Sequence, residues 1–179
     1  HEQAIDLGMI PSIEFLRGHE PYRIVPDLGI ISDGPVASVA LFCRTPLSAV
    51  RTIAADISSR TSNALLRILC VERFGLDPEF VPMAPDATAM LARCDAALII
   101  GDPALDVEQR FPHRLDLAQD WLDWTDLPFV FAAWFARPGT VNADDEDIFR
   151  VAKQKGLARS DAIAAEHAAR SGLDVTSLR

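Results

Sequence analysis

The sequence lacks the patterns by which proteins usually bind nucleotide cofactors and metal ions. It contains no Walker phosphate-binding loop and no GxGxxG turn. Its four histidines are scattered along the chain, so they form no group with the spacing of metal ligands. It also lacks a Gly-x-Ser-x-Gly elbow, which leaves acyl-enzyme chemistry without support. We therefore expect a site with no metal and no nucleotide cofactor.

Cysteine and basic residues are scarce as well. The three cysteines stand far apart within apolar runs, a pattern typical of reduced, buried thiols in a cytosolic protein. The formal net charge is −9, and such a charge repels nucleic acid and anionic lipid. The apolar runs 36–43 and 129–136 are far too short to cross a bilayer. We expect a cytoplasmic protein with no nucleic-acid or membrane partner, in which backbone N–H groups or a single arginine would hold any anionic ligand.

What the sequence does contain is an alternation of apolar strand patterns and amphipathic helix patterns. The expected strands are 4–10, 22–25, 28–31, 36–44, 51–55, 96–100 and 129–136. The expected helices are 12–17, a further one opening at Thr45-Pro46, 59–74, 86–93, 116–124, 142–155 and 160–171. Continuous apolar strands that alternate with helices predict an α/β fold with a parallel sheet covered by helices.

The two longest apolar strands divide the chain. Strands 36–44 and 129–136 bracket an α/β block of about the size of a small domain. A block that the chain enters and leaves through two strands is typical of two-lobed ligand-binding proteins. We expect residues 1–44 to form part of lobe I, residues 45–128 to form lobe II, and residues 129–179 to add the return strand and terminal helices of lobe I.

The start of the helix expected at residue 59 is a candidate anion site. Four residues with hydroxyl side chains lie between the preceding strand and the first helical turn: Ser58, Ser59, Thr61 and Ser62. Free N–H groups at a helix start attract a carboxylate without requiring a basic protein. Helix capping is the alternative, because Ser and Thr are favoured caps. The residue types leave both interpretations open.

Two further candidate residues lie after or within expected strands. Asp102 comes directly after strand 96–100, where it could cap a helix or accept a hydrogen bond from a ligand hydroxyl. Ser38 lies within strand 36–44, after the turn Ser32-Asp-Gly-Pro35, whose glycine permits positive φ. A core serine bonded to the backbone is the simplest interpretation of Ser38 from its position alone.

Five motifs in order resemble one enzyme family. They are DLGMIPSIEF (6–15), PDLGIISDGPVASV (26–39), SRTSNALLRIL (59–69), LIIGDPAL (98–105) and WTDLPFVFAAW (124–134). Together they resemble chorismate dehydratase, an enzyme of the futalosine route to menaquinone. The resemblance spans residues 1 to about 137, and the terminal helices are compatible with it.

The resemblance implies a fold, a reaction and a set of site residues. The fold is that of the type 2 periplasmic binding proteins, used in the cytoplasm. The reaction is loss of water from chorismate to give 3-[(1-carboxyvinyl)oxy]benzoate, with no metal or organic cofactor. Ser38 matches the serine of the family's Asp-Gly-Pro-Val-x-Ser motif and becomes the catalytic candidate. The expected substrate-binding residues are Ser12, Gly34, Ser59, Arg60, Thr61, Ser62 and Asp102.

The sequence departs from the family pattern at several places. The usual Thr-Gly-Leu-Pro appears as Thr125-Asp126-Leu127-Pro128, and Asp-Leu-Gly appears as Asp116-Leu117-Ala118. The family's opening strand-helix segment is missing from this sequence, and with it the Tyr/Phe-Leu-Asn motif, whose asparagine the resemblance implies would face the substrate. Two alternatives stay open: a non-enzymatic cytosolic protein that binds small anions, and the related 1,4-dihydroxy-6-naphthoate synthase. The sequence makes no prediction of oligomeric state.

Overall fold

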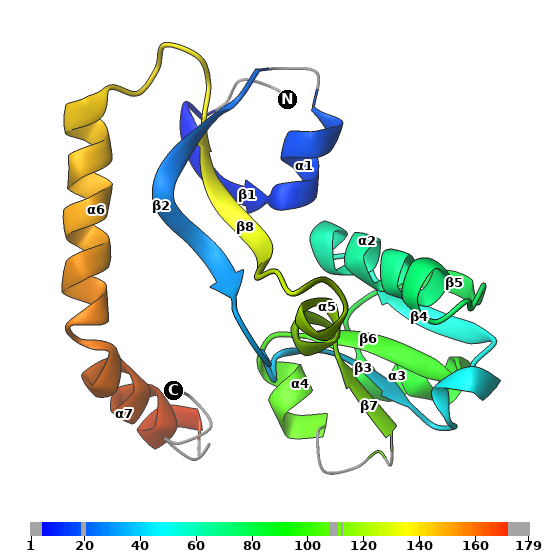
Figure 1. The fold of residues 1–179 in the computed structure, drawn as a ribbon. Helices are drawn as coiled ribbons and strands as arrows, with labels where there is room; N and C mark the ends of the chain where they lie inside the picture. Colours follow the sequence, from blue (N-terminus) through cyan, green and yellow to red (C-terminus); the bar gives the residue numbers. More distant parts are fainter. Residues whose placement is uncertain (1–4, 19–20, 108–110, 112, 172–179) are drawn as a thin grey trace. The chain divides into compact units, whose positions relative to one another are not determined.

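A computed structural model describes residues 5–18, 21–107, 111 and 113–171 (Figure 1). Strands and helices alternate along most of the chain, which confirms the predicted α/β class. The strands are β1 (Leu7–Pro11), β2 (Arg23–Ser32), β3 (Val39–Cys43), β4 (Thr52–Asp56), β5 (Glu79–Met83), β6 (Ala96–Ile100), β7 (His113–Asp116) and β8 (Phe129–Ala136). The helices are α1 (Ser12–Arg17), α2 (Arg60–Ile68), α3 (Ala87–Arg93), α4 (Asp102–Val107), α5 (Leu117–Thr125), α6 (Ala143–Leu157) and α7 (Ser160–Ser171). A short 3-10 turn, η1 (Leu47–Ala49), precedes β4, and a π-helical turn, η2 (Leu69–Arg73), extends α2.

Five strands form a mixed sheet in the order β5-β4-β6-β3-β7. Strand β4 runs parallel to β5 and β6, whereas β3 runs antiparallel to both β6 and β7. The expectation of an all-parallel sheet is therefore wrong. An apolar strand covered on both faces has the same residue pattern in either direction, so the sequence did not reveal the reversal of β3.

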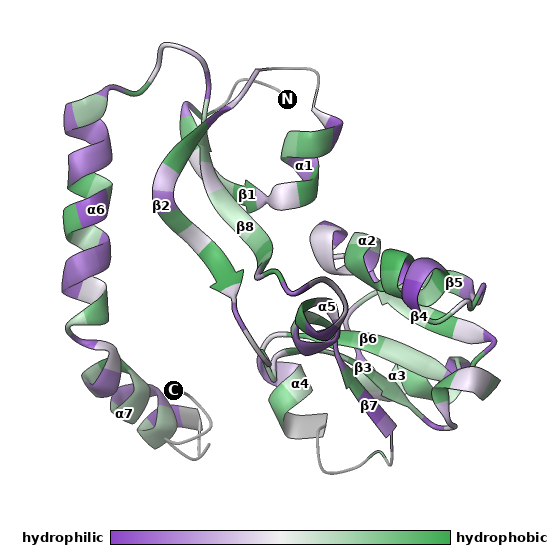
Figure 2. Ribbon diagram, in the orientation of Figure 1, coloured by the Kyte–Doolittle hydropathy of each residue, from purple (hydrophilic) through white to green (hydrophobic). Residues whose placement is uncertain are grey.

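Helices cover both faces of this sheet. Leu41 and Leu98 face α2 and α5 in one buried cluster, and the neighbouring Phe42 and Ala97 face α3 in another. Figure 2 shows that β3 and β6 are hydrophobic along their length, as strands buried on both faces must be. The core of the chain therefore lies on the two sides of β3 and β6.

The other three strands form a smaller sheet in the order β1-β8-β2. The sequence predicts two strands broken by Pro26, but β2 is one strand that passes through this residue. Proline cannot donate a ladder hydrogen bond, and it is tolerated here because β2 is at the edge of the sheet. Asp27, which follows it, takes a positive φ of 61°. The predicted break at Pro26 is therefore only a local irregularity within a continuous strand at the edge of the sheet.

Several predicted helix starts are confirmed, and others are wrong. The helices predicted to start at residues 86 and 142 are confirmed, and the side chains of Asp86 and Asn142 cap α3 and α6. Pro46 precedes the 3-10 turn η1 instead of opening a helix, whereas the helix predicted over residues 160–171 is confirmed as α7. Strands β5 and β7 and helix α4 were not predicted, because they are short and carry no clear periodicity. The start of the strand predicted at residue 4 lies outside the described residues.

The chain divides into two compact units. Unit 1 comprises residues 1–8, 20–28 and 134–179, and unit 2 comprises residues 9–19 and 29–133. Unit 2 contains the five-stranded sheet, and unit 1 contains α6 and α7. The lobe boundaries expected from the sequence, at 44/45 and 128/129, stay a prediction. No helix in the described ranges combines the length and the apolar character that a bilayer-spanning segment needs.

The three cysteines are free and buried, as the sequence predicts. Burial raises the pKa of the Cys43 thiol to about 12, and the nearby Cys70 adds to this effect. Burial likewise raises the pKa of the Cys70 thiol to about 11, with Arg67 acting in the opposite direction. Because the thiolate is the reactive form, these two side chains are unreactive packing groups at neutral pH.

Candidate functional site

One edge of the five-stranded sheet in unit 2 brings most of the predicted site residues together. At this carboxyl edge, the carboxyl ends of β4, β6 and β7 lie beside the amino end of β3, because β3 runs antiparallel to its neighbours. Helices α2, α4 and α5 begin at the same edge, one after each of these three strands. In open α/β sheets, ligands bind beyond the carboxyl ends of strands and next to helix N-termini.

Ser38 lies at this edge, immediately before β3. The sequence predicts it within a strand, but the strand begins only at Val39. Its carbonyl accepts a 2.8 Å hydrogen bond from the Gly101 N–H at the end of β6, and its own N–H donates to the Val36 carbonyl. The side chain is half-buried, and within the described ranges its hydroxyl makes no hydrogen bond. The backbone-bonded core serine that the sequence favours is therefore not what the described residues show.

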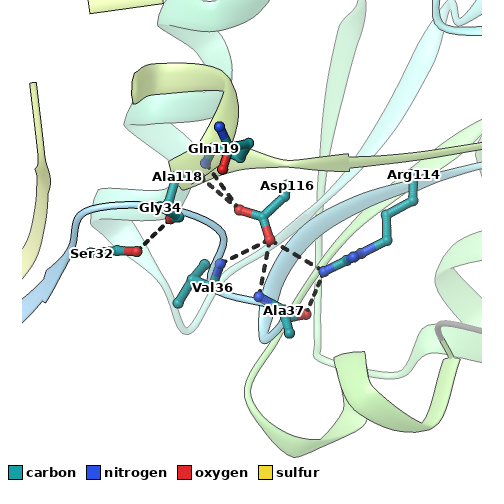
Figure 3. A network of polar contacts seen from close by, with 8 residues as sticks. All are labelled: Ser32, Gly34, Val36, Ala37, Arg114, Asp116, Ala118 and Gln119. Carbon is teal, nitrogen blue, oxygen red and sulfur yellow. Dashed lines mark hydrogen bonds and ion pairs between the residues drawn. The ribbon is translucent and has the colours of Figure 1, made fainter. Parts of the chain in front are cut away.

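The loop before Ser38 is held by the carboxylate of Asp116, the last residue of β7 (Figure 3). Its Oδ2 accepts hydrogen bonds from the N–H groups of Val36 and Ala37, both at 3.0 Å. The guanidinium of Arg114 lies 3.3 Å from the same oxygen and donates a 3.0 Å hydrogen bond to the Ala37 carbonyl. These contacts occupy the backbone groups of residues 36 and 37, which explains why the loop does not join the strand.

The other oxygen of Asp116 caps a helix. Oδ1 accepts hydrogen bonds from the N–H groups of Ala118 and Gln119, at 3.1 and 3.2 Å, in the first turn of α5. The side chain is nearly buried, with an exposed fraction of 9%. One carboxylate therefore joins the Ser38 loop to the start of a helix (Figure 3).

Two residues of the Ser38 loop take a positive φ. Gly34 has a φ of 151°, in a region that suits glycine, and its carbonyl accepts a 2.6 Å hydrogen bond from the Ser32 hydroxyl. This confirms the glycine-permitted turn that the sequence predicts. Ala37 has a φ of 41°, which a residue with a Cβ atom adopts at an energetic cost. The residue directly before Ser38 is therefore strained.

The start of α2 carries the predicted hydroxyl groups. Ser59 occupies the N-cap position, but its side chain makes no hydrogen bond to the helix backbone and instead lies 2.7 Å from the Ser62 hydroxyl. Asp56, at the end of β4, is 1% exposed and accepts hydrogen bonds from the Ser58 N–H and hydroxyl, at 2.8 and 2.6 Å. The capping interpretation is thus wrong for the Ser59 side chain.

Helix α1 packs beside the start of α2. Thr61 Oγ1 accepts a 3.4 Å hydrogen bond from the Ile13 N–H, and Arg60 forms a 3.0 Å ion pair with Glu14. The Ser12 hydroxyl donates a 2.7 Å hydrogen bond to the Val130 carbonyl. Three of the predicted substrate-binding residues, Ser12, Arg60 and Thr61, therefore also make contacts that stabilise unit 2.

The structure thus brings the predicted site residues to neighbouring positions along one edge, with the exception of Ser12, which lies in α1 and is bonded to β8 of the other sheet. Ser59–Ser62 follow β4, Asp102 follows β6 as the exposed first residue of α4, and Ser38 precedes β3. Sequence reasoning missed Asp116 and Arg114: an aspartate at a helix start indicates a cap, but no local signal indicates the contacts of Asp116 to residues 36 and 37. Groups of His, Cys, Asp and Glu that could hold a metal ion do not occur among the described residues.

Comparisons with known proteins identify relatives of this chain. A family model described as menaquinone biosynthesis matches residues 1–179. A chorismate dehydratase of Thermus thermophilus is 29% identical over 187 residues, which cover 94% of this chain and 68% of that protein. A chorismate dehydratase of Campylobacter jejuni is 34% identical over 131 residues, which cover 73% of this chain and 44% of that protein.

Solved structures share the fold. Protein AF1704 of Archaeoglobus fulgidus matches with a TM-score of 0.71 at 21% identity, over 98% of this chain and 67% of that chain. The periplasmic aliphatic sulphonate binding protein SsuA of Escherichia coli matches with a TM-score of 0.61 at 22% identity, over 98% and 64%. At these identities the likeness concerns the fold alone, and it confirms the predicted periplasmic-binding-protein-like fold.

Proposed function

The chain belongs to the menaquinone biosynthesis family, matched along its whole length, and from this premise we propose that it is a chorismate dehydratase. The reaction converts chorismate to 3-[(1-carboxyvinyl)oxy]benzoate and one molecule of water. A hydroxyl group leaves one ring carbon and a hydrogen leaves the neighbouring carbon that carries the enolpyruvyl ether. The cyclohexadiene ring becomes aromatic, so the overall step is downhill. The protein must therefore mainly orient the ring, hold its carboxylates and move a proton.

The observation that carries the proposal is the arrangement of Ser38 and the start of α2 at one sheet edge. Strands β4 and β3 are separated by β6 alone, so the two groups lie roughly 10 Å apart at the ordinary strand spacing. A substituted six-membered ring spans about this distance. The N-terminus of α2 has no side-chain cap, so its dipole and N–H groups favour a substrate carboxylate.

Ser38 supplies the second half of the proposed site. Its hydroxyl is free of hydrogen bonds within the described residues, so it can donate to the departing hydroxyl group or relay a proton. We assign it that catalytic role, with Ser12, Gly34, Ser59, Arg60, Thr61, Ser62 and Asp102 forming the substrate-binding surroundings. The buried, free thiols suit the reducing cytoplasm, which is where we expect the reaction to occur.

The test is direct conversion of chorismate by the protein expressed from its complete gene. The reaction is followed by chromatography and mass spectrometry in the presence of a metal chelator, with heat-denatured protein as the control. We expect an aromatic product that has lost one water. Calorimetric binding of chorismate without any conversion would instead identify a binding protein and would contradict the proposal.

A further inference from the structure

We propose that Asp116 is a positioning residue for Ser38, an inference that rests on the proposed function and extends it. Asp116 does not belong to the predicted substrate-binding set, and it acts through the loop that precedes Ser38. The evidence is the hydrogen-bond network of its carboxylate (Figure 3). Arg114 assists it from two residues earlier in the same strand, β7.

The network leaves the backbone before Ser38 little freedom. Both N–H groups at residues 36 and 37 donate to Asp116, the Ala37 carbonyl accepts from Arg114, and the Val36 carbonyl accepts from the Ser38 N–H. All four backbone polar groups of these two residues are therefore engaged. In a strand, these N–H and C=O groups would pair with a neighbouring strand. Among the described residues, residues 36 and 37 pair with no strand.

The strain at Ala37 explains why its backbone needs several hydrogen bonds to stay in this conformation. A φ of 41° is unfavourable for alanine and persists only where the surroundings over-determine it. If the contacts to Asp116 are lost, we expect Ala37 to relax toward a negative φ. Ser38 follows it directly, so its hydroxyl would move relative to the start of α2. A misplacement of about 1 Å is enough to slow an enzyme by about 100-fold.

Asp116→Ser separates the two tasks of the carboxylate. Serine is a favoured N-cap, so the variant keeps a cap on α5. Its single short hydroxyl cannot also reach the two loop N–H groups. We expect kcat for chorismate to fall by about 10- to 100-fold with KM nearly unchanged, because only the position of Ser38 changes.

Asp95→Ser is the matched control. Asp95 also accepts two consecutive N–H groups, those of Arg51 and Thr52 at 2.9 Å each, but it lies at the opposite edge of the same sheet. We expect this variant to melt at a lower temperature while its kcat per folded molecule stays at the wild-type value. Hydrogen exchange adds a readout independent of turnover: the amides of Val36, Ala37 and Ser38 should exchange faster in Asp116→Ser and not in Asp95→Ser.

The outcomes are distinguishable. Wild-type protein that does not convert chorismate overturns the proposed function and this inference with it. Active wild-type protein with an equally active Asp116→Ser variant, or with unchanged exchange at residues 36–38, overturns the positioning role alone. If Asp116→Ser does not fold, the kinetics of Arg114→Met test the inference instead. This variant loses the hydrogen bond to the Ala37 carbonyl and keeps the Asp116 cap on α5. A severalfold lower kcat at constant KM then supports the inference, and an unchanged kcat overturns it.

Discussion

The two edges of the five-stranded sheet are each fastened by an aspartate that accepts two consecutive backbone N–H groups. At the amino edge, Asp95 holds Arg51 and Thr52, where β4 begins. Its contacts are reciprocal, because its own N–H donates to the Thr52 hydroxyl at 3.0 Å. At the carboxyl edge, Asp116 holds Val36 and Ala37 in a conformation that does not pair with any strand.

The difference shows that one local motif can serve two purposes. The Asp95 contacts support an ordinary extended backbone, so their loss should lower stability. The Asp116 contacts support a strained backbone beside helix N-termini, where ligands bind in this type of sheet. Changes at the carboxyl edge should therefore alter turnover or binding more than stability, and changes at the amino edge should do the reverse.

The largest effect is expected for Ser38→Ala. If the hydroxyl donates or relays a proton, kcat should fall by about 100-fold or more, with melting and chorismate affinity nearly unchanged. Ser48→Ala is the matched control, because Ser48 is exposed near the other end of β3. Steady-state kinetics and thermal melts of both variants test this. A Ser38→Ala variant that melts early and turns over normally would show that Ser38 is a structural residue.

A smaller effect is expected at the start of α2. Thr61→Ala should weaken chorismate binding by on the order of 1–2 kcal/mol if this helix start holds a substrate carboxylate. Its stability should fall less, although the Ile13 N–H loses its 3.4 Å partner. Titration calorimetry of Thr61→Ala and of Thr52→Ala, a threonine at the amino edge, makes the comparison. Equal affinities of both variants and the wild type would argue against an anion site.

The smallest effect is expected at Asp95 and depends on pH. The N–H groups of Arg51 and Thr52, in that order, hold the pKa of Asp95 below its ordinary value of about 3.8. A lowered folded-state pKa stabilises the fold above the unfolded-state pKa, and the benefit is lost as the pH falls through the folded-state value. Asp95→Asn should therefore cost about 1 kcal/mol at neutral pH. Urea unfolding should show this deficit shrinking below about pH 4, and a constant deficit would contradict the assignment.

Much of the fold could be predicted because its signals are local. The apolar runs predicted the bounds of β6 and β8 to the residue, and the helices predicted to start at residues 86 and 142 are capped by Asp86 and Asn142. The reversed direction of β3 could not be predicted, because strand direction depends on the path of the chain between strands. An apolar run has the same residue pattern in either direction. The continuity of β2 through Pro26 depends on its place at a sheet edge, which is likewise a property of the assembled sheet.

The candidate site, like the fold, has some features that the sequence predicted and others that it did not. The hydroxyl-rich start of α2 and the turn at Gly34 were visible in the sequence, since each depends on neighbouring residues. The role of Asp116 was not visible, because its partners at Val36 and Ala37 lie about 80 positions earlier in the chain. The partners are also backbone N–H groups, which nearly every residue has, so the residue types at positions 36 and 37 do not predict these contacts.

The buried cysteines have a practical consequence for following ligands at the carboxyl edge. Because Cys43 and Cys70 are buried and have raised pKa values, and Cys94 is only 2% exposed, the natural thiols should not compete for maleimide dyes in the folded protein. Ile57, directly after β4, is 61% exposed. A cysteine introduced there would give a single fluorescent reporter beside the start of α2, without first removing any native cysteine.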